Sequence, residues 1–280
     1  MRQIVTITTC ALILVLAAGT AFAQDSEQDI LNRYIQQTEK KHAVKYGWTS
    51  VTFGMDRINR DNTYNTFATY ESQNIDGGEF NWLNMGTSFG AEFAMIFRER
   101  FAWTVGGEYW LKMGSQLDGD YTYLPTATTL ENPSTEIQVY GFSSGLQYFL
   151  INPPDDRGKL HQPAVRLIGT AGFYFANWEL FSAYQNLNLS TSTPEGENAA
   201  YKGSAPGFSL GFGADYPINV WGLALGADMS YLYLNFDNVS WYNAQDEEIV
   251  ASYNGTEDGR VDLNVSGFRG RIELKKYLSW

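Results

Sequence analysis

Long segments that alternate apolar and polar residues with a period of two dominate the sequence from residue 45 onward. This period is that of a β-strand with one apolar face, and the segments are longer than most strands of soluble proteins. We expect eight such segments, at 45–56, 83–98, 101–116, 135–151, 162–178, 205–217, 220–236 and 260–280. The chain is therefore predicted to be an all-β protein built from eight long strands.

The connections between these segments alternate between short and long. Residues 99–100, 152–161 and 218–219 are short, whereas the long connections are 57–82, 117–134, 179–204 and 237–259. Even strand number, tight turns at one end and long loops at the other are typical of small transmembrane β-barrels. The sequence thus predicts an eight-stranded antiparallel up-and-down transmembrane β-barrel. Ten strands remain an alternative if part of 57–82 or 179–204 forms another hairpin.

One phase of the alternation is large and apolar, and the other is small or charged. The large phase includes Phe89, Phe93, Met95, Phe97, Trp103, Val105, Leu111, Leu167, Phe173, Phe208, Leu210, Phe212, Leu225 and Met229. The opposite phase is rich in Gly, Ala and Ser, whereas a soluble sandwich would carry many Lys, Glu and Thr residues there. We therefore expect the large phase to contact lipid and the small phase to fill a narrow interior.

Aromatic residues gather where the predicted strands cross the two membrane interfaces, as expected of aromatic girdles. They are Tyr46, Trp48, Trp103, Tyr148, Tyr216, Trp221 and Tyr277 at the short-turn end, and Trp110, Trp178, Tyr233 and Trp241 at the other. The general preference of aromatic residues for strands explains their number equally well. The girdle is therefore only supporting evidence for a membrane barrel.

The last segment, Arg269-Gly-Arg-Ile-Glu-Leu-Lys-Lys-Tyr-Leu-Ser-Trp280, places Ile272, Leu274 and Leu278 in one phase and ends on the aromatic Trp280. In this pattern the chain resembles Gram-negative outer-membrane β-barrel proteins. Its architecture over residues 45–280 is similar to the small OmpX, OmpW and OmpA-transmembrane group. The resemblance implies a place in the bacterial outer membrane, termini in the periplasm and long loops outside. It also implies that these four residues form the signal read by the barrel-assembly machinery, and that the lipid partners are outer-membrane lipid and lipopolysaccharide.

Two features of the last segment depart from a simple pattern. Lys276 stands where an apolar residue is usual, so either recognition is weakened or the side chain snorkels to the interface. The apolar phase also shifts between Val265 and Phe268. A bulge near Ser266-Gly267 would reconcile the two phases, or the first part of the strand projects above the bilayer.

The first 44 residues have the composition of a targeting segment and a short extension. Residues 1–23 combine an early Arg, an apolar stretch and the small-x-small end Ala21-Phe-Ala23, which predicts a signal peptide cleaved after Ala23. The single cysteine, Cys10, lies within it. Residues 24–44 are predicted to be a loosely held periplasmic extension. The alternative is a short helix that rests on the membrane surface or enters the periplasmic mouth of the barrel.

Charged residues on the small phase are the main candidate site. We expect a lumen charge network made of Glu92, Arg98, Glu108, Lys112, Arg166, Asp215, Asp228, Arg269, Arg271, Glu273 and Lys275. An eight-stranded barrel is just wide enough for side chains, and paired charges are tolerable there whereas isolated ones are costly. The prediction is a lumen plugged by salt bridges. The alternative is a narrow channel lined by these charges, or a gate that opens when they rearrange.

Most of the acidic excess falls on the long loops. The formal net charge is −12, and residues 57–82, 117–134, 179–204 and 237–260 together hold 16 acidic and four basic residues. Such a balance argues against nucleic acid as a partner. The loops either bind a surface ligand, through divalent cations, lipopolysaccharide or another protein, or form a solvated rim. Asp118-Gly-Asp120 and Asp246-Glu-Glu248 lack the spacing of a calcium loop, so no metal site is predicted.

Catalytic motifs are missing from the sequence. Both histidines, His42 and His161, fall at the short-turn side, and no phosphate loop, zinc motif or dinucleotide fingerprint occurs. We therefore expect a non-enzymatic barrel without a cofactor, with a structural or surface-interaction role through its long acidic loops. The alternatives are a small channel or apolar-solute conduit and, third, a lipid-modifying enzyme that uses a carboxylate site.

Overall fold

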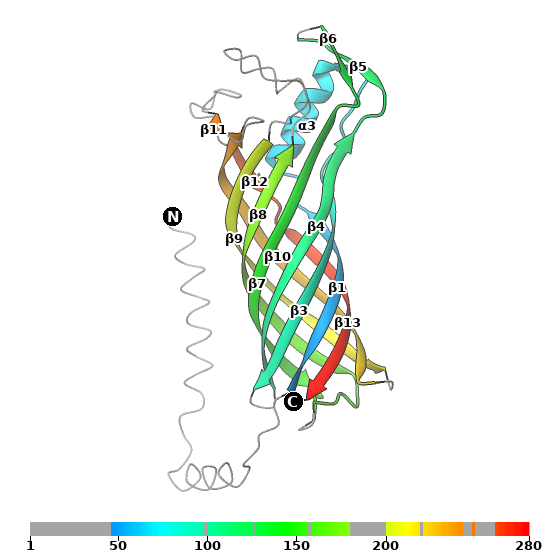
Figure 1. Ribbon diagram of the computed structural model, residues 1–280, viewed down its shortest axis with the longest axis vertical. Coiled ribbons are helices and arrows are strands. Elements are labelled where there is room, and N and C mark those ends of the chain that lie inside the picture. The colour runs from blue at the N-terminus through cyan, green and yellow to red at the C-terminus, as the bar shows by residue number, and fades with distance from the viewer. Residues whose placement is uncertain are drawn as a thin grey trace, which may run out of the picture. The chain divides into compact units, whose positions relative to one another are not determined.

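A computed structural model describes residues 46–97, 100–125, 127–155, 158–179, 200–218, 221–242, 248–249 and 261–279. Eight of its strands form one closed antiparallel barrel, in which each strand pairs with its neighbours in chain order (Figure 1). They are β1 (Tyr46–Ile58), β3 (Met85–Phe97), β4 (Phe101–Gln116), β7 (Ser134–Ile151), β8 (Ala164–Glu179), β9 (Ala200–Ile218), β10 (Leu223–Tyr242) and β13 (Gly267–Ser279). The predicted eight-stranded barrel is confirmed.

The barrel closes between its first and last strands. β1 pairs with β13 from Tyr46 opposite Ser279 to Ile58 opposite Gly267, without a register shift. Among the described residues, no helix is long and apolar enough to cross a membrane. The predicted signal peptide and the extension at 24–44 lie outside the described residues, and so do Arg98 and Trp280.

The connection 57–82 forms a helix instead of an additional hairpin. Asn62 caps the helix α3 (Thr63–Asn74) by accepting a hydrogen bond from the Asn65 amide at 2.9 Å. A small sheet follows, in which β2 (Ile75–Asp76) pairs with β5 (Asp120–Tyr123), and β5 pairs with β6 (Thr128–Glu131). Figure 1 shows these elements at the end of the barrel that carries the long connections, which we call the long-loop end.

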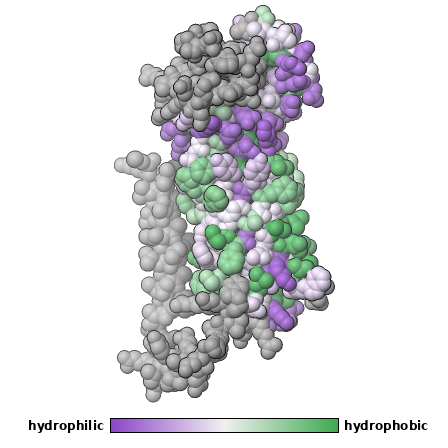
Figure 2. Space-filling view, in the orientation of Figure 1, coloured by the Kyte–Doolittle hydropathy of each residue, from purple (hydrophilic) through white to green (hydrophobic). Residues whose placement is uncertain are grey.

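An apolar belt covers the outer face of the barrel wall (Figure 2). Apart from the half-buried Met95, the predicted lipid-facing residues are among the exposed large side chains, which include Phe53, Phe89, Phe93, Phe142, Leu167, Phe173, Phe208, Leu210, Phe212, Leu225, Met229, Phe268, Ile272 and Leu274. So large an exposed apolar surface on a closed barrel is stable only in lipid. The barrel therefore spans a membrane with this face outward.

The apolar phase turns inward at the long-loop end. Ile137 and Val139 of β7 are fully buried inside, while Glu136 and Gln138 of the same strand face outward. Figure 2 shows the corresponding hydrophilic band next to the apolar belt. Beyond the belt the wall meets water instead of lipid, so it follows the rule of a soluble barrel, with apolar residues inside.

This inversion corrects part of the predicted aromatic girdles. Trp110 and Trp178 are 0% and 1% exposed and lie in the interior, as do Trp48 and Tyr277 at the opposite end. Other members do face outward, and these include Trp103, Tyr216, Trp221 and Tyr233. Side-chain size and strand position alone could not separate interior aromatic residues from interfacial ones.

The predicted phase change before the last strand is present. Among the described strands, β12 (Val261–Asn264) pairs only with β10, and β13 begins after a break at Val265–Ser266. The buried Ser266 hydroxyl lies 2.9 Å from the Leu234 amide, from which it accepts, and 3.2 Å from the Leu234 carbonyl, to which it donates. At the point where the inward and outward positions shift, the serine hydroxyl thus takes the place of a backbone partner for Leu234. A further short strand, β11 (Glu248–Ile249), pairs with the end of β10.

Candidate functional site: the filled lumen

The last strand provides a column of inward side chains along the barrel. Arg269, Arg271, Glu273, Lys275 and Tyr277 alternate with the lipid-facing residues of β13, as a period of two requires. Each meets partners from other strands across the narrow interior. Strand alternation alone therefore places four charged groups of this strand in the lumen.

Arg166 of β8 is the centre of a first ionic cluster. Its guanidinium lies 2.5 Å from the Glu273 carboxylate and 3.2 Å from that of Asp215, and it donates to the Gln147 side-chain oxygen at 2.6 Å. Lys275 bridges the same two carboxylates at 3.1 Å to Asp215 and 2.9 Å to Glu273. All four charged side chains are at most 3% exposed. Two cations and two anions therefore alternate in a water-excluded square.

A second cluster lies closer to the long-loop end. Arg269 stands opposite Asp56 in the β1–β13 register and pairs with that carboxylate at 2.5 Å and with Glu108 at 2.9 Å. Arg271 also donates to Glu108, and Ser88 donates to Asp56 at 3.0 Å. Side chains of β1, β3, β4 and β13 are thereby joined across the interior.

Two further carboxylates complete the ionic layer. Glu92 accepts hydrogen bonds from the Trp48 indole at 3.1 Å and from the Gln147 amide at 3.2 Å. Asp228 stands directly opposite Arg271 in the β10–β13 register and is 8% exposed. Among the described residues, this ionic layer thus holds six acidic groups, Asp56, Glu92, Glu108, Asp215, Asp228 and Glu273, against four basic ones, Arg166, Arg269, Arg271 and Lys275.

Glycines of the inner wall make room for this layer. A Cβ at Gly226 would lie 2.8 Å from both the Asp215 and Glu273 carboxylates. A Cβ at Gly141 would lie 2.3 Å from the Tyr174 ring, and one at Gly207 would lie 2.6 Å from its other edge. The small phase seen in the sequence therefore provides space for large inward side chains, not for an open bore.

An apolar layer fills the lumen at the long-loop end and is covered by α3. Phe67 of α3 packs edge-on against Trp178, with ring centroids 5.2 Å apart, and Tyr64 donates to the Thr135 carbonyl at 3.0 Å. Asn65 accepts from the Leu83 amide at 2.6 Å and donates to the Leu83 carbonyl at 3.1 Å. Burial raises the pKa of the Tyr64 phenol well above its ordinary value. The helix is therefore fastened to the barrel by side chains on its buried face.

An aromatic layer fills the opposite, short-turn end. Trp48 packs against Phe149 and Tyr277 with ring centroids 6.0 Å and 5.6 Å apart, and the Lys275 ammonium lies 4.7 Å from the Trp48 ring. Tyr277 donates to the Asp215 carboxylate at 3.2 Å, which joins this layer to the first ionic cluster. Side chains from three layers thus occupy the described length of the lumen.

The structure brings together most of the predicted network, with two exceptions. Lys112 is wrongly predicted to face inward: the β4–β7 register shifts between Trp110 and Met113, and this bulge turns Lys112 outward. There it pairs with Glu136 and Glu179, each at 3.1 Å. Arg98, the other exception, lies outside the described residues.

Several interior groups were missed by the sequence reasoning. Asp56 lies in the same inward phase of β1 as Trp48 and Ser50, so the alternation itself carried the signal. Gln147 links Glu92 to Arg166, but nothing in the sequence distinguishes it from an ordinary inward polar residue.

The described residues of the predicted assembly signal share the outer face. Ile272 and Leu274 are exposed and Leu278 is half-buried, all in the lipid-facing phase of β13. Lys276 lies in the same phase, and its ammonium donates to the Trp221 carbonyl in the β9–β10 turn. The lysine therefore snorkels toward the short-turn end, which was one of the two expectations for it.

Groups suited to catalysis or metal binding are scarce in the described part of the chain. No set of three or more His, Cys, Asp or Glu side chains there is arranged to hold a metal ion. His161 is exposed near the short-turn end and lies 2.9 Å from Asp155. Most of the lumen carboxylates are bound by arginine, lysine, tryptophan or glutamine partners, which hold them in place across the barrel.

Comparison with known proteins finds matches among solved structures alone. No family model and no curated protein matches this chain. Solved structures that resemble it include OprG from Pseudomonas aeruginosa, at 14% identity and a TM-score of 0.44 over 84% of this chain and 96% of that one. A major outer membrane protein from Thermus thermophilus has 15% identity and a TM-score of 0.46, over 85% of this chain and 100% of that one. The outer membrane protease OmpT from Escherichia coli has 9% identity and a TM-score of 0.36, over 84% of this chain and 96% of that one.

These three solved structures resemble the chain in fold, and one of them is a protease by name. All three identities are at most 15%, and all three TM-scores are below 0.5. A likeness at this level shows the fold and assigns no function.

Proposed function

We propose that this chain is a non-enzymatic barrel of the bacterial outer membrane that does not conduct, and whose role lies in the surface at its long-loop end. The observation that carries the proposal is the filled lumen. Arg166 and Lys275 in the ionic layer, and Trp48 and Trp178 in the layers on either side, are at most 1% exposed. A passage for ions would require these side chains to be reachable by water.

The long-loop end favours a surface role over a purely membrane-embedded one. Helix α3 and the β2–β5–β6 sheet give this end a folded shape. Five acidic residues are exposed on it: Asp61, Asp76, Asp118, Asp120 and Glu131. A folded acidic surface supports binding of a basic protein segment, or of lipopolysaccharide through divalent cations. Under the proposal this end faces the cell exterior, and the termini lie in the periplasm.

The orientation is tested by labelling single cysteines in whole cells. The chain has one cysteine, Cys10, which falls within the predicted leader, so the mature barrel offers a cysteine-free background. Gly119 lies at the long-loop end and Lys159 in the β7–β8 turn. Gly119→Cys should react with a membrane-impermeant maleimide on intact cells, and Lys159→Cys only after lysis. The reverse pattern would overturn the proposed orientation.

The surface role is tested by complementation of a deletion strain. A variant with Asp61, Asp118, Asp120 and Glu131 changed to their amides should fold but fail to restore adhesion and outer-membrane integrity. A matched variant carries Lys112→Gln on the outer wall and should restore both. Full complementation by the loop variant would refute a role for the acidic surface.

The described residues favour a non-enzymatic barrel over the third alternative, a lipid-modifying enzyme. Acyl transfer needs a base near its nucleophile, and His161, the histidine among the described residues, lies at the short-turn end beside Asp155. Five of the six carboxylates of the described ionic layer are engaged by cations, an indole or an amide, and the sixth, Asp228, stands opposite Arg271 in the β10–β13 register. These contacts favour a structural and surface-interaction role.

A further inference from the structure

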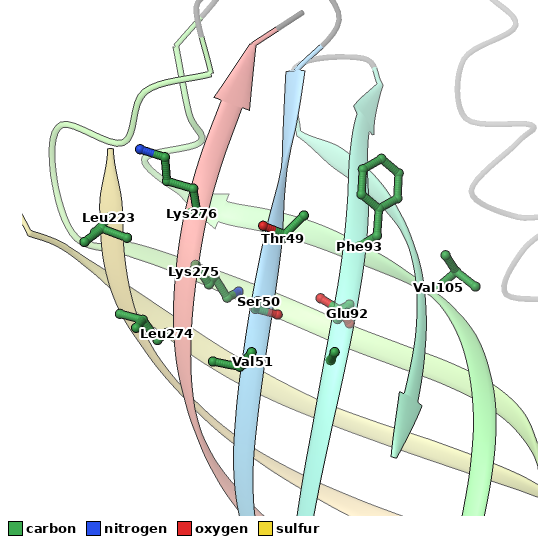
Figure 3. A pocket seen from close by; sticks show the side chains of 11 residues that line it. Thr49, Ser50, Val51, Glu92, Phe93, Val105, Leu223, Leu274, Lys275 and Lys276 are labelled. Atoms are coloured by element: carbon green, nitrogen blue, oxygen red, sulfur yellow. The ribbon is translucent and has the colours of Figure 1, made fainter. Parts of the chain in front are cut away.

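A depression of about 580 Å³ interrupts the apolar belt near the short-turn end (Figure 3). The side chains of Thr49, Val51 and Ala91 form its floor, and they are smaller than the Phe and Leu residues that cover most of the belt. In the register, Thr49 stands between Lys276 and Phe93, and Val51 stands between Leu274 and Ala91. Larger neighbours on β3, β10 and β13 therefore wall a shallow groove that crosses the β1–β13 seam.

The only described cation within this groove's outward-facing wall is Lys276. Lys276 stands opposite Leu223 in the β10–β13 register. Figure 3 shows its side chain directed toward the short-turn end of β13, where its ammonium reaches the Trp221 carbonyl. That carbonyl occupies one of the three donor positions of an ammonium group, which leaves two for another acceptor. The charge is thus held at the edge of the groove, on the side of the short turns.

Trp221 marks this edge as the interface between lipid tails and headgroups. Its side chain is 82% exposed, the largest exposed fraction among the large apolar side chains of the described barrel. Its backbone φ of 55° is unusual for a bulky residue, and the following Gly222 also has a positive φ, of 69°. An amphipathic ring held in this way is typical of headgroup depth, where phosphate groups also lie.

We infer that the groove binds a phospholipid, with an acyl chain on Thr49, Val51 and Ala91 and the phosphate on the Lys276 ammonium. A concave apolar wall in a bilayer is filled by hydrocarbon, because an empty groove would forfeit dispersion contacts. Charge decides which lipid fills it, since an ammonium at headgroup depth favours an anionic headgroup. The inference rests on the membrane-spanning barrel and on no property of the lumen.

The experiment uses the mature chain reconstituted in bilayers of equal phosphatidylglycerol and phosphatidylcholine, then released into mild detergent. Native mass spectrometry counts the lipids that each barrel retains. The wild type should keep one phosphatidylglycerol in preference to phosphatidylcholine. Lys276→Gln should lower this preference about fivefold, as expected for one cation at a membrane surface, and Lys276→Arg should keep it.

Two pairs of variants separate the groove from general effects. Ala91→Phe should fill the floor and abolish retention of either lipid, whereas Ala171→Phe, on the exposed outer face of β8, should not. Lys112→Gln, another outward cation, should leave the preference unchanged. Each variant is first shown to fold by circular dichroism.

Three outcomes would overturn the inference. Equal phosphatidylglycerol preference in Lys276→Gln and wild type would remove the headgroup contact. Equal retention in Ala91→Phe and Ala171→Phe would remove the acyl site. A lipid-free dimer that Ala91→Phe abolishes would assign the groove to a second copy of the chain. Because these variants leave the lumen intact, their results leave the non-conducting proposal unaffected.

Discussion

Replacing Arg166 with methionine tests whether the buried charges hold the barrel closed. The substitution keeps a long unbranched side chain but removes the cation that lies between Glu273 and Asp215. Lys275 then faces both carboxylates alone, at 2.9 Å and 3.1 Å, so the square of charges retains one uncompensated anion.

The expected loss follows from the burial of these groups. Removing one partner of a buried ion pair costs about 3–5 kcal/mol, because it leaves the other charge buried and unpaired. Gln147 also loses the hydrogen bond at 2.6 Å that its side-chain oxygen accepts from Arg166. We expect Arg166→Met to lower the free energy of unfolding by about 3–5 kcal/mol.

The assay is reversible unfolding by guanidinium in lipid vesicles, followed by tryptophan fluorescence. Adding Glu273→Gln to Arg166→Met should restore part of the loss, because Lys275 and Asp215 then remain as a single pair. Lys112→Gln, on the outer wall, should change stability by less than about 1 kcal/mol. A stability of Arg166→Met within about 1 kcal/mol of wild type, or a further loss in the double variant, would refute the reasoning.

Three further predictions concern the helix and the inner wall. Asn65→Ala should release α3 from Leu83, cost about 1–3 kcal/mol through the unpaired backbone groups, and speed amide hydrogen exchange in the helix; unchanged exchange would contradict this. Gly141→Ala should destabilise the barrel by about 1–3 kcal/mol by overpacking against Tyr174, and Tyr174→Leu should relieve the loss; a thermal melt that shows neither effect would disprove the fit. Because burial raises the pKa of Tyr64, the stability from its neutral phenol is fully present below pH about 10 and is lost as pH rises toward the raised pKa. Wild type should therefore lose stability above pH about 10 more steeply than Tyr64→Phe in unfolding titrations, and parallel curves would exclude this effect.

Alternation of residue size was sufficient to predict the barrel and its lipid-facing side, because a period of two and a closed wall leave one consistent assignment. It could not predict where the surroundings change from lipid to water. Trp110 and Trp178 were therefore placed at an interface, although they fill the lumen beyond the apolar belt. The same change of surroundings puts Leu263 and Val265 inside, in an apolar core.

Local irregularities explain the remaining differences. The bulge before Met113 reverses the phase of β4, and one extra residue moves Lys112 from the lumen to the outer wall. Helix α3 was treated as loop, although Asn62 is a capping residue and Tyr64, Phe67 and Ala68 have helical spacing. That segment is one short helix within a β-protein, and its buried face also holds Asn65 and Glu71, so it is defined by the barrel end that it covers.

The central claim is that the lumen is closed, and ion conductance across a planar bilayer tests it most directly. The mature chain is inserted at several salt concentrations and voltages, and insertion is confirmed on the same sample by protease protection. The filled ionic and aromatic layers predict a silent membrane. Stable unitary current steps in the wild type would contradict a closed lumen and would make the inward charges a selectivity filter.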